Sequence, residues 1–148
     1  MKRYILSTML AAAAIALAPA PSVAAAQDPS FTATLSGGAF AVAKDGKYYV
    51  YDLAGRGTKL GTCTGVFENH YSNGSNTLVG FATITAATGD SLDVEYTQTW
   101  NGTQWVGQYN SVGGIGRFAD ATGSGAMGAA FNAAHTVVTV TFEGTISF

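Results

Sequence analysis

Cysteine, proline and charged side chains are all scarce in this 148-residue chain. The single cysteine, Cys63, excludes an internal disulfide framework and every zinc or iron–sulfur site that needs several cysteines. Charged residues make up 11% of the chain, against about 25% in a typical soluble domain, and the formal net charge is −2. Because no basic excess is available to neutralise phosphates, a nucleic-acid-binding protein is not expected.

Proline, at 3 residues, and histidine, at 2, narrow the possible functions further. So little proline beside 47% hydrophobic and 11% aromatic residues excludes collagen and disordered low-complexity chains. Neither His70 nor His135 has a second ligand at helical or C-x-x-C spacing, so we predict no metal site and no cofactor. A G-x-S-x-G elbow is missing as well, which argues against a hydrolase of that type.

The one long apolar run lies at the N-terminus and is typical of a signal peptide. Lys2 and Arg3 precede the apolar segment Tyr4–Leu17, and the small residues that end at Ala26 fit a signal-peptidase site. A retained anchor is the alternative, but about 14 apolar residues fall short of the roughly 20 that span a bilayer. We therefore predict a cleavable signal peptide over 1–26 and a mature chain that starts at Gln27.

The predicted mature chain, residues 27–148, is an acidic single domain. Loss of Lys2 and Arg3 leaves 7 − 2 = 5 basic against 9 acidic residues, a net charge of −4. This sign disfavours binding to anionic lipid, and no other segment is long and apolar enough to span a membrane. We expect an exported protein, periplasmic or extracellular, in which Cys63 is a buried free thiol or pairs with another chain.

Apolar and polar side chains alternate along the mature chain with a period of two, and helical periodicity is missing. Near the C-terminus Val138, Val140 and Phe142 share one face of a predicted strand, while Thr139 and Thr141 share the other. The candidate strands are Phe31–Val42, Lys47–Leu53, Leu60–Tyr71, Thr77–Ala87, Leu92–Trp100, Thr103–Tyr109, Thr122–Asn132 and Val138–Phe148.

Turn signals at Asp45-Gly46, Asn73-Gly74 and Asn101-Gly102 separate these strands and favour tight hairpins. About eight strands at regular spacing are typical of an antiparallel sandwich or barrel. Short connections predict that each strand pairs with the next, and a closed barrel leaves no exposed edge. We therefore predict an all-β fold, an eight-stranded antiparallel up-and-down β-barrel, whose interior is either packed or able to hold one small ligand.

One segment, Ser111–Gly125 (SVGGIGRFADATGSG), resembles the GGTGRFAxATGSG motif of the allene oxide cyclase-like barrels. This group includes the plant cyclases, the dirigent proteins and many small exported bacterial proteins. Gly61–Phe67, Asp90–Thr97 and Phe142–Ile146 are also similar to the family pattern, so the resemblance covers roughly residues 60–148. It implies an eight-stranded antiparallel barrel with an apolar lumen, often assembled as a dimer or trimer.

The glycine motif also has a direct physical interpretation. Gly113, Gly114 and Gly116 permit unusual φ angles and a close backbone approach, which help a strand to bend and a barrel to close. It is not a phosphate-binding loop, because no Lys-Ser/Thr pair and no helix follow it. Arg117 then lies either on the surface at a corner of the barrel or inside the barrel beside Phe118.

The candidate site is a set of aromatic and polar side chains on the inward faces of the strands. If Phe67 points inward, alternation turns Asn69 inward with it. Tyr49 and Tyr51 share one face of their strand, but Tyr48 lies on the opposite face, so the sequence does not decide which of the two faces is inward. An apolar pocket with a few polar groups is the usual form of a ligand site. We predict catalytic or polar contacts from Asn69, Tyr71, Tyr96 and Arg117, and ligand-binding contacts from Tyr49, Tyr51, Cys63, Phe67, Trp100, Trp105 and Tyr109.

Carboxylates are not expected in this lumen. The family's cyclases rely on a buried carboxylate, but the first strand has no acid over Phe31–Leu35, and Glu68, Asp93 and Glu95 fall on the predicted outer faces. The plant reaction is therefore in doubt. In the reversed register these acids and His70 would line the lumen together, but that register would expose every apolar side chain.

Two functions fit this sequence. The first is a barrel that holds a small hydrophobic or phenolic molecule and steers a reactive intermediate, as a cofactor-free isomerase, cyclase or lyase. The second is a non-catalytic exported barrel that carries a ligand or contributes a stable surface to a homo-oligomer.

Overall fold

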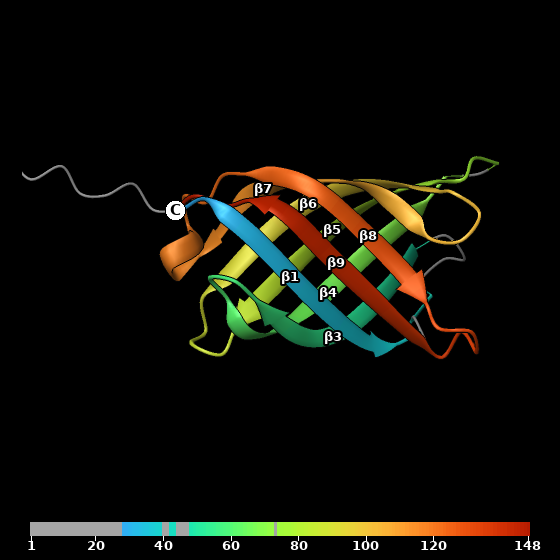
Figure 1. Cartoon of the computed structure of the whole chain (residues 1–148), viewed down its shortest axis with the longest axis horizontal. Coiled ribbons are helices and arrows are strands. Elements are labelled where there is room, and N and C mark those ends of the chain that lie inside the picture. Colours follow the sequence, from blue (N-terminus) through green and yellow to red (C-terminus); the bar gives the residue numbers. More distant parts are fainter. Residues whose placement is uncertain (1–27, 40–41, 44–47, 73) are drawn as a thin grey trace, which may run out of the picture.

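The computed structural model describes residues 28–39, 42–43, 48–72 and 74–148. The predicted signal peptide, the predicted mature N-terminus at Gln27 and the Asp45-Gly46 turn lie outside the described residues. In the described part, nine strands and one short 3₁₀ turn, η1, follow one another along the chain (Figure 1). They are β1 (Ser30–Gly38), β2 (Val42–Ala43), β3 (Tyr48–Gly57), β4 (Gly61–Tyr71), β5 (Thr77–Ala86), β6 (Ser91–Trp100), β7 (Trp105–Ile115), η1 (Gly116–Phe118), β8 (Ser124–Phe131) and β9 (Val137–Thr145).

Eight of these strands close into an antiparallel barrel, as predicted. From β3 to β9 each strand pairs with the next, and β1 pairs with both β9 and β3. Leu35 of β1 thus lies opposite Val140 on one side and Gly55 on the other. The two-residue β2 pairs only with β3 and takes no part in the closure. A sandwich is excluded, because the ring of pairings has no open edge.

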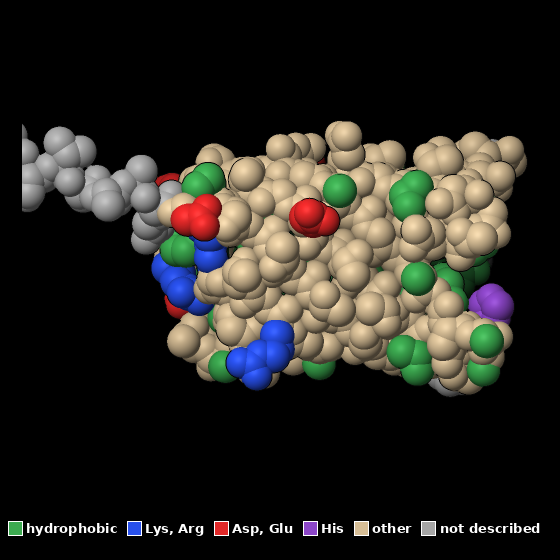
Figure 2. Space-filling model, viewed as in Figure 1, with side chains coloured by type: hydrophobic (Ala, Val, Ile, Leu, Met, Phe, Trp, Pro, Cys, Tyr) green, Lys and Arg blue, Asp and Glu red, His purple; other side chains and the backbone are tan. Residues whose placement is uncertain are grey.

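Alternation along the strands sorts side chains into a core and a wet surface. In β1, Phe31, Ala33 and Leu35 are buried while the intervening residues are exposed. On the outer face hydroxyl side chains meet across strands, as where Ser36 Oγ lies 2.8 Å from Thr139 Oγ1. The face over β1, β8 and β9 is accordingly neutral and polar for the most part, with apolar side chains scattered singly (Figure 2).

The strand β7 is longer than predicted. It continues past Tyr109 to Ile115, so the first glycines of the motif belong to a strand. Gly113 and Gly114 still pair with Asp93 and Leu92 of β6, beyond a register shift between Asp93 and Val94. The bulge admits the extra residue that the bend requires. The described residues contain no helix long and apolar enough to cross a membrane.

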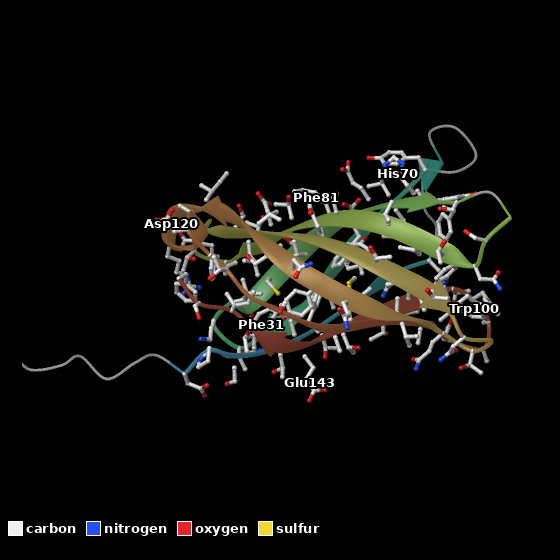
Figure 3. All side chains as sticks on the ribbon, turned by 90° about the horizontal axis from the view of Figure 1, so that it is seen from above. Phe31, His70, Phe81, Trp100, Asp120 and Glu143 are labelled. Atoms are coloured by element: carbon white, nitrogen blue, oxygen red, sulfur yellow. The ribbon has the colours of Figure 1, made fainter. Side chains whose placement is uncertain are left out.

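The two ends of the barrel differ in chemistry. At the η1 end, where η1 and the β3–β4 and β5–β6 turns meet, Leu60, Phe118 and Ile146 close the core with apolar side chains. The tryptophan end, where the β4–β5, β6–β7 and β8–β9 turns meet, carries Trp100. Figure 3 shows Asp120 and Trp100 at opposite ends of the barrel.

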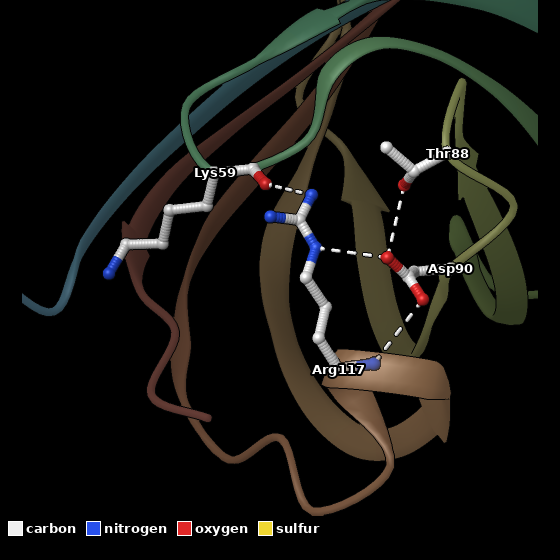
Figure 4. Close-up of polar contacts among 4 residues, drawn as sticks. All are labelled: Lys59, Thr88, Asp90 and Arg117. Atoms are coloured by element: carbon white, nitrogen blue, oxygen red, sulfur yellow. Dashed lines mark hydrogen bonds and ion pairs between the residues drawn. The ribbon is translucent and has the colours of Figure 1, made fainter.

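An arginine holds the turns of the η1 end together (Figure 4). Arg117 Nε lies 3.4 Å from Asp90 Oδ2, and its Nη2 donates to the carbonyl oxygen of Lys59 at 2.5 Å. Asp90 also accepts a hydrogen bond from Thr88 Oγ1 at 3.0 Å. The Arg117 side chain is 40% exposed, so the ion pair with Asp90 contributes little to stability. The structural effect of Arg117 is to connect η1 with the β3–β4 and β5–β6 turns.

Gly116 is the residue on which this arrangement depends. Its φ is +69°, and a Cβ there would lie 1.9 Å from Asp90 Oδ1. Gly61 has a similar φ of +65°, but nothing lies within 4 Å of its Cβ position.

Gly61→Ala is therefore expected to lower the free energy of unfolding by about 1 kcal/mol, because alanine is strained only by the left-handed backbone conformation. Gly116→Ala should lower it by about 1 kcal/mol more, because the Asp90 carboxylate must move and give up the hydrogen bonds that it accepts from the Arg117 backbone N–H and from Thr88 Oγ1. Urea unfolding of both variants measures the difference, and equal losses would contradict this role of Asp90.

Candidate functional site

The polar side chains of the lumen gather toward the tryptophan end. Asn69 of β4, Gly80 of β5 and Tyr96 of β6 lie in one row across the sheet. The next row toward the tryptophan end joins Tyr71, Leu78 and Gln98. All of these positions face inward, which agrees with the predicted directions of β4 and β6. The fold thus places amides and phenols above an otherwise apolar core.

A glycine makes the central hydrogen bond of this group possible. A Cβ on Gly80 would lie 2.2 Å from the ring of Tyr96, so the ring occupies the space that a side chain would fill. The phenol crosses β5 there and donates a hydrogen bond to Asn69 Oδ1 at 2.5 Å. Tyr96 is only 4% exposed. The side chains of β4 and β6, which are not neighbouring strands, are therefore joined over the inner face of β5.

A narrow crevice opens beside this pair. Its volume is about 20 Å³, enough for about one water-sized group and far below the roughly 150 Å³ cavity that holds a benzene molecule. The lumen is therefore packed rather than hollow. Of the predicted residues, those that line the crevice are Tyr51, Phe67, Asn69, Tyr71, Tyr96 and Trp105.

Gln98 also lines the crevice and was missed by the sequence analysis. It is 2% exposed, and its Nε2 has no hydrogen-bond acceptor among the described residues. Leaving such a donor unpaired costs about 1–3 kcal/mol. The available signal was the alternation of β6, because residue 98 stands between the inward-facing Tyr96 and Trp100.

Aromatic side chains form a connected rim at the tryptophan end. The ring centroids of Tyr49 and Tyr71 are 5.3 Å apart, those of Tyr71 and Trp105 are 5.4 Å apart, and those of Trp105 and Trp100 are 5.6 Å apart. The first two pairs meet edge to face, a favoured aromatic geometry. Phe131 of β8 is partly buried and also lines the crevice.

Burial keeps the phenols of the lumen protonated. It is the largest cause that raises the pKa of Tyr51, Tyr71 and Tyr96, and the neighbouring Tyr51 raises that of Tyr71 further. Burial also raises the pKa of Tyr109 to about 12, against a hydrogen bond to the Thr145 carbonyl oxygen that lowers it. At neutral pH these groups donate hydrogen bonds and do not act as bases.

The remaining predicted residues lie apart from the crevice. Tyr109 is buried deeper, where its hydroxyl donates to the Thr145 carbonyl oxygen at 3.2 Å. Cys63 is a buried free thiol near the start of β4, on the η1 side, and burial raises its pKa. Arg117 lies on the surface at the η1 end, so the structure does not bring it together with Asn69, Tyr71 or Tyr96.

The acidic side chains face outward. Glu68, His70 and Glu95 line an open depression of about 490 Å³ on the outer face of β4–β7, around Phe81. Glu68 accepts a hydrogen bond from the Tyr48 hydroxyl at 2.5 Å. This arrangement excludes the reversed register, so no carboxylate or imidazole is among the residues that line the crevice. In the described part of the chain, no three acidic, histidine or cysteine side chains are grouped to hold a metal ion.

Comparison of the chain with protein families, with curated proteins and with solved structures finds no match. The resemblance to the allene oxide cyclase-like barrels therefore stays a prediction from the motif.

The raised phenol pKa values predict a loss of stability in alkali. Below about pH 10 the phenols are protonated in both the folded and the unfolded chain, and their burial contributes its full stability. As the pH rises above 10, unfolded phenols ionise while buried ones keep their protons, up to about 12 for Tyr109. The urea midpoint should therefore change little up to about pH 9 and fall between about pH 10 and pH 12, less steeply in Tyr109→Phe. A midpoint that stays constant over this range would contradict the burial of these phenols.

Proposed function

We propose that the protein binds a small aromatic or otherwise apolar molecule at the tryptophan end of the barrel. The observation that carries this proposal is the crevice itself, a small recess under an aromatic rim with a largely apolar lining and a few polar groups, among them Asn69 and Gln98. An apolar surface with a few convergent polar groups is the common form of a small-molecule site. At the opposite end the fully buried Phe118 closes the core.

The size of the crevice sets how such a ligand binds. A space of about 20 Å³ takes a single polar atom and not a ring. The polar atom of the ligand therefore enters the crevice, and its apolar body lies against Tyr71, Trp105 and Phe131. Aromatic contacts of this kind contribute about 0.5–1.5 kcal/mol each beyond the apolar area that they bury.

Binding fits this site better than acid–base catalysis. The lining phenols keep their protons at neutral pH, and no carboxylate or imidazole lines the crevice. An isomerase, cyclase or lyase at this site would act by orienting its substrate and excluding water.

The proposal includes export to the periplasm or the exterior, which rests on the N-terminal segment 1–26.

Tryptophan fluorescence tests the proposal, because both tryptophans of the chain, Trp100 and Trp105, belong to the rim. Titration with p-cresol is expected to give a saturable change in emission. Gly80→Ala should abolish it, since the new Cβ forces the Tyr96 ring toward the crevice. Gly128→Ala is the matched control, because its Cβ meets no atom closer than 3.3 Å. A change that never saturates and equals that of free N-acetyltryptophanamide would contradict the proposal.

A further inference from the structure

The unpaired amide of Gln98 is the polar group of the crevice that the proposed function leaves without a role. The side chain is 2% exposed, and Nε2 finds no acceptor among the described residues. The large majority of buried side-chain polar atoms in proteins are hydrogen-bonded, so a donor left free at a crevice points to an acceptor that enters from outside. The side-chain oxygen of Asn69, Oδ1, accepts its hydrogen bond from the Tyr96 hydroxyl at 2.5 Å and none from Gln98 Nε2.

We propose that Gln98 determines specificity by donating a hydrogen bond to a carbonyl oxygen of the ligand, so that the barrel prefers aromatic carbonyl compounds. This inference rests on the proposed function. A carbonyl oxygen accepts hydrogen bonds and brings no donor of its own, so it can accept from Nε2 without adding another unpaired donor to the crevice. A hydroxyl group would bring a second donor into a crevice whose phenols are donors already.

The dimensions of the crevice agree with this ligand chemistry. About 20 Å³ is enough for one oxygen atom, whether of a water molecule or of a ligand carbonyl group, and either oxygen could accept a hydrogen bond from Gln98 Nε2. The aromatic ring attached to that carbonyl then reaches the rim, where Tyr71 and Trp105 lie 5.4 Å apart.

The test compares acetophenone with ethylbenzene, which has a similar shape but no acceptor. Both are titrated into the full chain while the emission of Trp100 and Trp105 is recorded. Acetophenone is expected to bind roughly fivefold to tenfold more tightly, the usual effect of one neutral hydrogen bond. In Gln98→Met, which keeps the length of the side chain and removes the donor, this preference should disappear. Gln104→Met, a change in the exposed β6–β7 turn, is the control.

A measurement on the wild-type protein supports the test if Gln98→Met fails to fold. The side-chain amide signal of Gln98 in an ¹⁵N correlation spectrum is expected to shift with acetophenone and to stay in place with ethylbenzene.

The outcomes separate this inference from the proposed function. Preference for acetophenone that depends on Gln98 supports the inference. Equal binding of both probes, with no movement of the Gln98 signal, overturns the inference and leaves ligand binding at the rim intact. If neither acetophenone, ethylbenzene nor p-cresol changes the emission in a saturable way, the proposed function fails and the inference fails with it.

Discussion

The space inside an eight-stranded barrel is just wide enough for its own side chains, and this limit shapes the rest of the molecule. Each inward residue competes for volume with residues on strands that are distant in the sequence. The Tyr96 ring fits because Gly80, its partner on β5, has no side chain. The hydrogen bond from Tyr96 to Asn69 Oδ1, which stands beside the crevice, depends on that exchange of volume between two strands.

Much of the barrel could be predicted because alternation is a local property. The faces of β4 and β6 follow from the sequence of each strand alone, and so does the outward position of Glu68 and Glu95. Closure of eight strands followed from short connections and from the scarcity of charged residues that could protect an edge. The predicted end of β7, Tyr109, is too early, because the glycines that follow indicate a bend in the sequence. In the structure Gly113 and Gly114 still pair with β6.

Whether the lumen is packed or hollow could not be predicted, because this depends on the register between neighbouring strands. Nothing in the sequence near Gly80 says that a tyrosine sixteen residues later will cover it, since that contact exists only once β5 and β6 are paired. Gln98 was missed for a different reason: it is polar, and polar residues on a predicted strand are normally assigned to the wet face. The place of Arg117 at the η1 end likewise depends on Asp90 and Lys59, which other turns supply.

The two ends of the barrel therefore differ in the side chains that they carry. The η1 end carries the resemblance motif and closes the cylinder, whereas the tryptophan end carries the groups suited to a ligand. The most direct test is a high-resolution crystal structure of the protein purified from its own host. An oxygen atom, of water or of a retained ligand, should lie about 2.7–3.2 Å from Gln98 Nε2. An Nε2 that touches only apolar atoms, or a Gln98 side chain that points out of the barrel, would contradict the account.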